Sequence, residues 1–187
     1  IPEHDLTLDE SGALTHFASG HTVTRVGTVN VNDSTSAPLT RWIRTTTTSG
    51  DCAAYVDTGF DEVDASIRCR TNASGTIIGL LLHYVDASNF LTAELRTTGA
   101  YIRSVVSGTP TDVASDLFTR LEGRIYDLRA TKGGSNVTVY VNGEESIAAT
   151  TVGAPAQSAY GTSTNQGYYW RDSTSGYSAY FQLKPLS

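Results

Sequence analysis

Between positions 77 and 106 the chain alternates apolar and polar residues, and this period of two predicts β-strands. Turns at 86–89 and near Thr98-Gly99 would fold the segment into two antiparallel hairpins, with Leu80 opposite Leu95 and Glu94 opposite Arg103. Directly paired residues share a face of a sheet. The apolar face then holds Leu80, Leu82, Tyr84, Leu91, Ala93 and Leu95. The other face is half polar and holds Leu81, His83, Thr92, Glu94, Arg96, Tyr101 and Arg103.

Another hairpin is predicted between positions 126 and 141, with its turn at 132–135. This pairing collects six apolar residues on one face, namely Tyr126, Leu128, Ala130, Val137, Val139 and Val141. The opposite face carries Asp127, Arg129 and Tyr140. Directly afterwards, Asn142-Gly143 predicts a type I′ turn, because both residues accept positive φ angles. Residues 117–130 also contain apolar residues at helical spacing, but Gly123 and the hairpin favour a strand.

The remaining pattern and the composition predict an all-β protein. The clearest early strand is 22–31, and the tail 177–186 forms a closing strand with Tyr177, Ala179, Phe181 and Leu183 inward. Seventeen glycines, ten tyrosines and Thr/Ser tracts such as 45–48 are typical of short strands joined by many turns. The length of 187 residues fits one domain spanning 1–187, with a weakly patterned N-terminal segment at about 1–20.

Charge and hydropathy exclude two classes of partner. The formal net charge is −6 and the pI is about 5.1, so a nucleic-acid backbone would be repelled. The longest apolar run, 77–82, is far shorter than the ~20 residues of a membrane helix, so we expect no membrane insertion. The chain starts with Ile and has no Met, which indicates a processed product or a fragment of a larger protein.

The two cysteines, Cys52 and Cys69, lie symmetrically about a candidate turn at 59–62. If 52–69 formed a hairpin, the two would face each other and a disulfide would be feasible. It would contribute about 3 kcal/mol and would suit an extracellular setting. Two buried free thiols on a core face would leave the same sequence pattern.

Several motifs in order resemble the concanavalin A-like lectin/glucanase superfamily, and above all its laminin-G-like jelly rolls. They are Asp-Ala-Ser-Asn-Phe at 86–90, Ala-Glu-Leu-Arg at 93–96, Val-Val-Ser-Gly-Thr at 105–109, Val-Thr-Val-Tyr-Val-Asn-Gly at 137–143 and the terminal Tyr-Phe-Gln-Leu-Lys-Pro-Leu. The resemblance covers roughly residues 50–187. It implies a two-sheet antiparallel jelly-roll sandwich of a secreted or virion-surface protein, phage tails included. It also implies ligands on an exposed concave face or on rim loops. Fold does not settle function.

Glucanases of this superfamily carry Glu-x-Asp-x-x-Glu, or a close variant, on one strand. Glu62-Val63-Asp64 begins that motif, but Ile67 stands in the place of the last acid. Glycoside hydrolysis needs two converging carboxylates, so the sequence disfavours this activity.

Polysaccharide lyases of the same fold use Arg-Thr/Ser-Glu-Leu-Arg with Gln-x-His and a late Tyr. The segment 92–96 overlaps the first motif, but its leading Arg and the Gln-x-His are missing. A lyase reading would make His83 the general base, Arg96 the partner of a substrate carboxylate and Tyr101 the acid. It stays a third hypothesis.

No motif indicates a nucleotide, zinc or redox cofactor, and we expect none. Calcium is the exception left open, because hard-oxygen sites use Asp and Asn side chains. Asp86 and Asn89 have the right chemistry, although an Asx-type turn capped by its own side chains explains the same residues.

The main hypothesis is a non-catalytic carbohydrate-binding or adhesion module that contacts a glycan or cell-surface polysaccharide. The proposed contacts are His83, Glu94, Arg96, Tyr101 and Arg103, with Tyr140 or Trp170 stacking at the edge. Aromatic rings offer flat apolar surfaces and the polar groups offer directional hydrogen bonds, and sugars need both. The alternative is a solvent-exposed sheet face on which Glu94 and Arg103 form an ordinary cross-strand ion pair and bind no ligand. The second hypothesis is a structural virion domain whose exposed face contacts other virion proteins.

Overall fold

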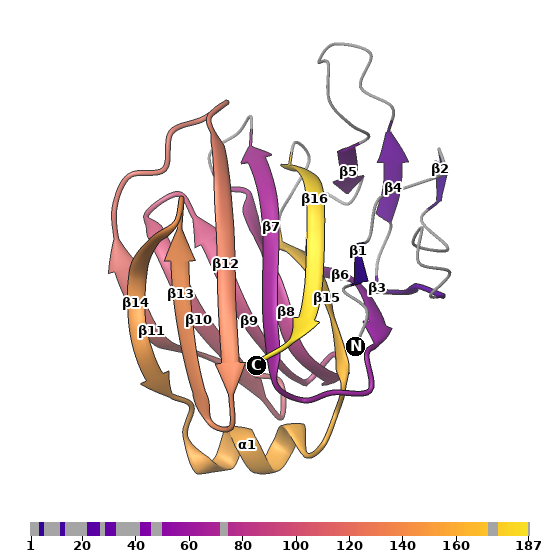
Figure 1. The fold of residues 1–187 in the computed structure, drawn as a ribbon, viewed down its shortest axis with the longest axis vertical. Helices are drawn as coiled ribbons and strands as arrows, with labels where there is room; N and C mark the ends of the chain where they lie inside the picture. The colour runs from indigo at the N-terminus through magenta and orange to yellow at the C-terminus, as the bar shows by residue number, and fades with distance from the viewer. Residues whose placement is uncertain are drawn as a thin grey trace.

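A computed structural model describes residues 4–5, 12–13, 22–26, 29–32, 42–45, 50–71, 75–171 and 176–186. They form two antiparallel sheets packed face to face (Figure 1). The all-β sandwich predicted from the sequence is confirmed.

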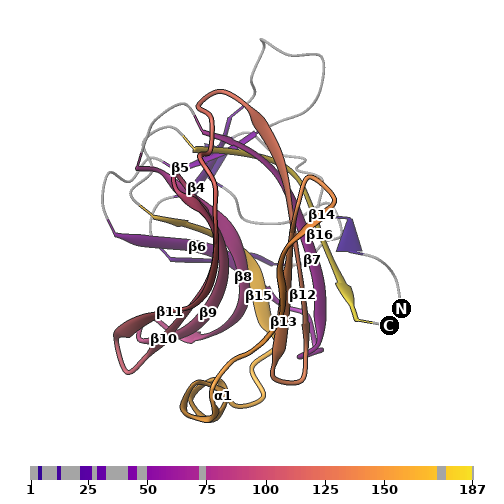
Figure 2. The same ribbon diagram turned by 90° about the vertical axis from the view of Figure 1, so that its left-hand side faces the viewer.

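The first sheet contains β1 (His4–Asp5), β2 (Gly12–Ala13), β4 (Val29–Asn32), β5 (Trp42–Thr45), β7 (Val63–Thr71), β12 (Ile125–Gly133), β13 (Asn136–Val141), β14 (Glu144–Thr151) and β16 (Gly176–Pro185). Its order is β14-β13-β12-β7-β16-β5-β4-β2, with β1 beside β16. The second contains β3 (Thr24–Val26), β6 (Asp51–Asp57), β8 (Ile77–Asp86), β9 (Asn89–Arg96), β10 (Gly99–Val106), β11 (Thr109–Leu117) and β15 (Asn165–Arg171). Its order is β11-β10-β9-β8-β15-β6-β3. Figure 2 shows this second sheet curving so that its outer side is hollow, and we call it the concave sheet.

The core lies between the sheets and follows the two-residue alternation. The concave sheet contributes Leu80, Leu82, Leu91, Ala93, Leu95, Ile102, Tyr168 and Trp170. The first sheet contributes Val63, Ala65, Ile67, Leu128, Ala130, Val137, Val139, Phe181 and Leu183. The rings of Tyr168 and Phe181 meet across the interface, with centroids 4.0 Å apart. Phe181 and Leu183 are inward as predicted, whereas the side chains of Tyr177 and Ala179 lie outside the described residues.

The predicted hairpins form, but two of their registers differ from the expected ones by two residues. The β9–β10 turn is at 97–98, so Glu94 lies opposite Tyr101 and Thr92 opposite Arg103. In the same way, Ala130 lies opposite Val139. Side chains alternate with a period of two, so a shift of two residues leaves every side chain on its predicted face. The type I′ turn is supported, because Asn142 and Gly143 both have positive φ, 54° and 86°.

The β8–β9 hairpin is different, because irregularities in its register change the faces. Leu81 lies opposite Thr92, but the next paired residue on β8 is His83, opposite Leu91. A bulge of this kind inserts one unpaired residue and reverses the alternation beyond it. His83 therefore points to the side of core residue Leu91, and Tyr84 joins Phe90 on the outer side. The predicted faces of His83 and Tyr84 are wrong for this reason.

The cysteine hairpin is also wrong. Strands β6 and β7 belong to different sheets, so the connection at 58–62 crosses from one layer to the other. Cys52 and Cys69 are buried and are not joined by a disulfide. Burial raises the pKa of Cys69 to about 12, which keeps it a neutral thiol. The predicted strand at 22–31 is likewise divided, since β3 and β4 lie in different sheets.

The helix α1 (Ala154–Tyr160) was not expected from the strand pattern. It has a proline in its first turn, and its buried residues Ala156 and Tyr160 are four apart, on one face. Figure 1 shows α1 beneath one end of the sandwich. Within the part of the chain that the structure describes, no helix has the length and apolar character to cross a membrane.

Two glycines, Gly79 and Gly167, lie at outward positions in the middle of the concave sheet. A Cβ on Gly167 would lie 2.1 Å from the carbonyl oxygen of Ala54, inside the neighbouring strand. We expect Gly167→Ala to lower the free energy of unfolding by about 2 kcal/mol, because the backbone must move. Gly153→Ala is the control, since the nearest atom to its Cβ is Pro155 Cδ at 3.8 Å. Urea denaturation measures both variants, and equal losses would contradict the steric explanation.

Candidate functional site

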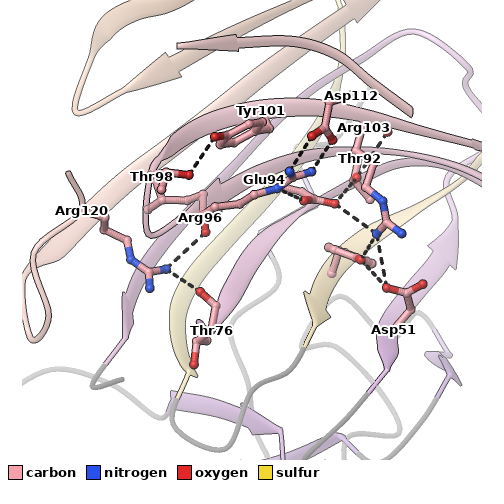
Figure 3. A network of polar contacts seen from close by, with 12 residues as sticks. Asp51, Thr76, Thr92, Glu94, Arg96, Thr98, Tyr101, Arg103, Asp112 and Arg120 are labelled. Carbon is pink, nitrogen blue, oxygen red and sulfur yellow. Dashed lines mark hydrogen bonds and ion pairs between the residues drawn. The ribbon is translucent and has the colours of Figure 1, made fainter. Parts of the chain in front are cut away.

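The outer surface of the concave sheet, which we call the concave face, carries a network of charged side chains around Glu94 (Figure 3). Glu94 is 0% exposed, and both of its carboxylate oxygens are occupied. Its Oε1 accepts a hydrogen bond of 2.9 Å from Thr92 Oγ1 and lies 3.5 Å from Arg103 Nη1. Its Oε2 accepts a hydrogen bond of 2.7 Å from Arg96 Nε. One buried carboxylate thus joins two arginines.

Arg96 connects this centre to the edge of the sheet. Its two terminal nitrogens donate to Asp112 on β11 over 2.8 and 2.6 Å, and its guanidinium lies 4.0 Å from the ring centroid of Tyr101. The hydrogen bond from Arg96 lowers the pKa of the Asp112 carboxyl. Burial alone would lower the pKa of Arg96, but Asp112 and Glu94 outweigh it and raise that pKa. The planar guanidinium is therefore held on both its edge and its face.

Arg103 connects Glu94 to Tyr169 on β15 and to Asp51 on β6. Its Nη1 donates to the Tyr169 hydroxyl over 2.5 Å and lies 3.3 Å from Asp51 Oδ1, to which the same hydroxyl donates over 2.5 Å. Burial, followed by the Glu94 charge, raises the pKa of Tyr169, so its phenol stays neutral. Burial opposes the charge on Arg103, but Tyr169, Glu94 and Asp51 outweigh it and raise the pKa of Arg103.

An apolar pocket adjoins this network. It has a volume of about 250 Å³ and is lined by Val26, Asp51, Cys52, Ala53, Leu81, Tyr84, Ala87, Phe90 and Tyr169. Its aromatic rings pack in a row, because the ring of Tyr84 lies 6.3 Å from that of Phe90, between centroids, and the row continues beyond the pocket lining to Tyr55, whose ring centroid lies 4.7 Å from that of Tyr84. Phe90 in turn lies 5.9 Å from Tyr169. Tyr169 and Asp51 belong to both pocket and network, so an apolar surface ends directly in hydrogen-bonding groups.

The chemistry of the concave face favours a polar but uncharged ligand. Three carboxylates, Asp51, Glu94 and Asp112, face three guanidinium groups, because Arg171 lies opposite Asp51 and its charge lowers the pKa of Asp112, so the concave face carries no net charge. Asp51 is 39% exposed at its side chain, and among the described residues its Oδ2 has no hydrogen-bond partner. That oxygen is an acceptor available to a hydroxyl group at the rim of the pocket.

The structure brings four of the predicted site residues together. Glu94, Arg96, Tyr101 and Arg103 share the concave face, as the alternation predicted. Whether they bind a ligand stays a prediction.

The other three do not join them. His83 lies on the inner side of β8 for the reason given above. Tyr140 is on the first sheet, where Arg129 lies 4.9 Å above its ring and pairs with Asp64 over 2.8 Å. Trp170 is 0% exposed and stacks on Tyr168 in the core, with centroids 5.2 Å apart.

Sequence reasoning missed Asp51, Asp112, Tyr169 and the pocket aromatics as part of the site. Tyr169 is next to Trp170, and in a strand only one of two neighbours can face outward. The segment 165–171 forms β15, which pairs with β6 and β8, two strands far from it in the sequence. No local signal therefore indicates which of Tyr169 and Trp170 faces outward. Asp51 reaches the site through the same long-range pairing.

Two other proposals from the sequence have a structural outcome. The lyase arrangement is not assembled, because His83 and Thr92 are on different sides of the concave sheet and Arg96 is engaged by Glu94 and Asp112. At the 86–89 turn, Asp86 Oδ1 accepts hydrogen bonds from the Ser88 backbone N–H over 2.7 Å and from the Asn89 amide over 3.0 Å. That is the Asx-type turn left open as an explanation of these residues.

No family model matches this chain, nor does any curated protein sequence. Solved structures share its fold. The carbohydrate-binding module CBM66 from Bacillus subtilis is 12% identical with a TM-score of 0.58, covering 86% of this chain and 89% of that one. Domain 4 of AbnA, a GH43 extracellular arabinanase from Geobacillus stearothermophilus in complex with arabinotriose, is 12% identical with a TM-score of 0.60, covering 96% and 93%.

A protein of unknown function with a galectin-like fold, also from Bacillus subtilis, is 8% identical with a TM-score of 0.60 and covers 97% of both chains. These similarities define the class of the fold, a lectin-like β-sandwich. At such identities they show the fold and no more.

Proposed function

We propose that the chain is a non-catalytic carbohydrate-binding module and that its ligand lies on the concave face. The observation that carries this proposal is the junction of the aromatic pocket with the hydrogen-bonding network at Asp51 and Tyr169. A sugar ring has apolar C–H faces and a rim of hydroxyl groups, so it needs an aromatic surface and directional polar groups side by side. Two structural neighbours support the proposal, one a carbohydrate-binding module and the other an arabinanase domain in complex with arabinotriose.

The charge of the site favours neutral over acidic sugars. Arg96 and Arg103 are each paired with two carboxylates, and with Arg171 beside them the cluster carries no net charge. An anionic sugar would have to displace a carboxylate from one of these two arginines. On a glycan array we therefore expect neutral glycans to bind and uronic-acid or sialylated glycans not to bind.

Asp51→Asn is expected to weaken binding of an array-positive glycan about tenfold, because a charged acceptor is replaced by a neutral one. Asp127→Asn is the matched control. It is also a half-exposed aspartate paired with an arginine, Arg68 at 2.7 Å, but on the outer side of the first sheet. Isothermal titration calorimetry measures both affinities. A flat array, or equal effects of the two substitutions, would refute binding on the concave face.

The aromatic part is tested by a second pair. Tyr55→Ala removes a half-buried ring that packs against Tyr84, and Tyr140→Ala removes a ring on the first sheet. We expect about tenfold weakening for Tyr55→Ala, because Tyr84 of the pocket loses the ring that packs against it, and no change for Tyr140→Ala. The reverse result would move the site to the first sheet.

A domain that contacts other proteins, as in a virion, is a second candidate, favoured by a separate observation. Residues 117–125 carry three exposed large apolar side chains, Leu117, Leu121 and Ile125. Apolar groups exposed in one stretch are typical of association surfaces. Light scattering distinguishes the two functions, because a protein-contact domain would assemble and bind no glycan. We place either kind of domain on a secreted or virion-surface protein.

A further inference from the structure

A second cavity lies at the α1 end of the sandwich and plays no part in the concave face. It has a volume of about 240 Å³, and its lining includes Asp61, His83, Lys132, Gln157 and Tyr160. These residues come from the 58–62 connection, β8, β12 and α1, so both sheets and the helix enclose it. The ring of Tyr160 lies 6.1 Å from that of His83, between centroids.

The hydrogen bonds of His83 determine which of its nitrogens carries the proton. Its Nε2 lies 3.3 Å from the backbone oxygen of Asp61, and a carbonyl oxygen can only accept, so Nε2 is the N–H donor. Burial, together with the nearby Lys132 charge, lowers the pKa of His83 to about 4, so the ring is neutral near pH 7. Nδ1 then has a lone pair and no proton. It is buried, and among the described residues it has no hydrogen-bond partner, although His83 is only 2% exposed.

Lys132 supplies the complementary group. It is 8% exposed, and its Nζ donates to the same oxygen of Asp61 over 3.0 Å. An ammonium has three donors, so protons remain for a second acceptor. The cavity therefore presents a buried acceptor, Nδ1 of His83, and a buried cationic donor, Nζ of Lys132, both held by one carbonyl oxygen.

A neutral group that can both donate and accept a hydrogen bond satisfies both. A carboxylate would pair with Lys132 but would place its lone pairs against that of His83 Nδ1. An ammonium group would donate to Nδ1 but would face the Lys132 charge. A hydroxyl group can donate to one and accept from the other. The volume is below the roughly 300–1,000 Å³ of pockets for drug-sized molecules, which limits the occupant to about one ring.

We propose that this cavity is a second binding site, which takes a single neutral hydroxyl-bearing ring or polyol, such as the terminal residue of a glycan. Neighbouring hydroxyl groups of the ligand donate to His83 Nδ1 and accept from Lys132 Nζ. The site is independent of the concave face, because His83 and the Glu94 network lie on different sides of the concave sheet. It would stand even if the concave face bound nothing.

The test is nitrogen NMR of the histidine ring in the intact protein. The probes are methyl β-D-glucopyranoside, methyl α-D-galactopyranoside, methyl α-L-arabinofuranoside and glycerol, with sodium glucuronate as the anionic comparison. The His83 signals are assigned by their loss in His83→Gln. We expect at least one neutral probe to shift the Nδ1 resonance in a saturable way, with a millimolar Kd, while glucuronate does not.

Variants separate this site from the concave face. Lys132→Met removes the donor and keeps the aliphatic stem, so it should weaken the probe at least tenfold with the His83 signal still present as a reporter. Asp51→Asn should leave the shift unchanged. No shift with any neutral probe at about 0.1 M, a hundredfold above a millimolar Kd, would show that only water occupies the cavity and would overturn the proposal. So would a shift that Asp51→Asn abolishes and Lys132→Met preserves.

Discussion

Glu94→Gln is expected to lower the free energy of unfolding by about 3 kcal/mol, the low end for breaking a buried ion pair from one side. The substitution keeps the shape of the side chain and removes its charge. Arg96 and Arg103 then share a buried surface without the carboxylate between them, although each keeps an aspartate, Asp112 or Asp51. Guanidinium chloride denaturation measures the loss.

The control removes the charge of a more exposed partner of the same arginine. The side chain of Asp112 is 46% exposed, so water compensates Arg96 when Asp112→Asn is made. We expect a loss below about 1 kcal/mol. If Asp112→Asn cost as much stability as Glu94→Gln, or if Glu94→Gln cost none, burial of Glu94 would not be what holds the network together.

This stability effect and the proposed binding role are compatible, since they concern different atoms. Glu94 has both oxygens engaged within the protein, so it orients the arginines rather than offering itself to a ligand. The groups left for a ligand lie at the ends of the network, above all Asp51 Oδ2 beside the aromatic pocket. A fully hydrogen-bonded centre with available polar groups at its ends is the arrangement expected of a preorganised binding site.

The faces of β9 and β10 could be predicted from the sequence because alternation has a period of two. The β9–β10 register differs from the predicted one by two residues, an even number, so Glu94, Arg96, Tyr101 and Arg103 lie on one face as predicted. The bulge in β8 could not be predicted. It adds a single unpaired residue, which no local pattern marks, and it sends His83 and Tyr84 to opposite faces from those expected.

Long-range pairing explains the remaining errors. Cys52 and Cys69 fit a hairpin, but their strands pair with β15 and β16 from the end of the chain instead of with each other. The polar neighbours of Trp170 in the sequence predict a surface position for it. The pairing of β15 between β6 and β8 buries it and turns Tyr169 outward. Contacts between distant segments therefore decided both the sandwich layers and half of the candidate site.

His83 is expected to make the stability of the protein fall between pH 6.5 and pH 4. The ordinary pKa of this side chain is 6.5, and burial, together with Lys132, lowers it to about 4 in the folded protein. Between these two values the unfolded chain binds a proton that the folded protein excludes, so the free energy of unfolding decreases as the pH falls. The stabilisation is fully present above pH 6.5 and is lost on the way down to pH 4. The shift corresponds to about 3 kcal/mol.

The groups around His83 do not remove this pH dependence of the free energy of unfolding between pH 6.5 and pH 4. Burial lowers the pKa of Lys132 on β12, but Lys132 remains a cation in this acidic range, and Tyr160 on α1 remains a neutral phenol because burial raises its pKa. Asp61 accepts from the ring through its backbone oxygen, and its charge raises the pKa of His83 by less than burial and Lys132 lower it. Asp64 and Asp112 have pKa values below the ordinary 3.8, so their contributions are lost only at lower pH.

The measurement compares urea denaturation of wild type and His83→Gln at intervals from pH 7 to pH 4. Because Gln does not titrate, the wild type should lose about 3 kcal/mol more than the variant across this range. Tyr140→Phe, on the first sheet, removes no group that titrates in this range and should retain the wild-type slope. Parallel curves for wild type and His83→Gln would mean that the folded protein accepts the proton, and hence that Nδ1 is not the buried, unprotonated acceptor on which the second binding site depends.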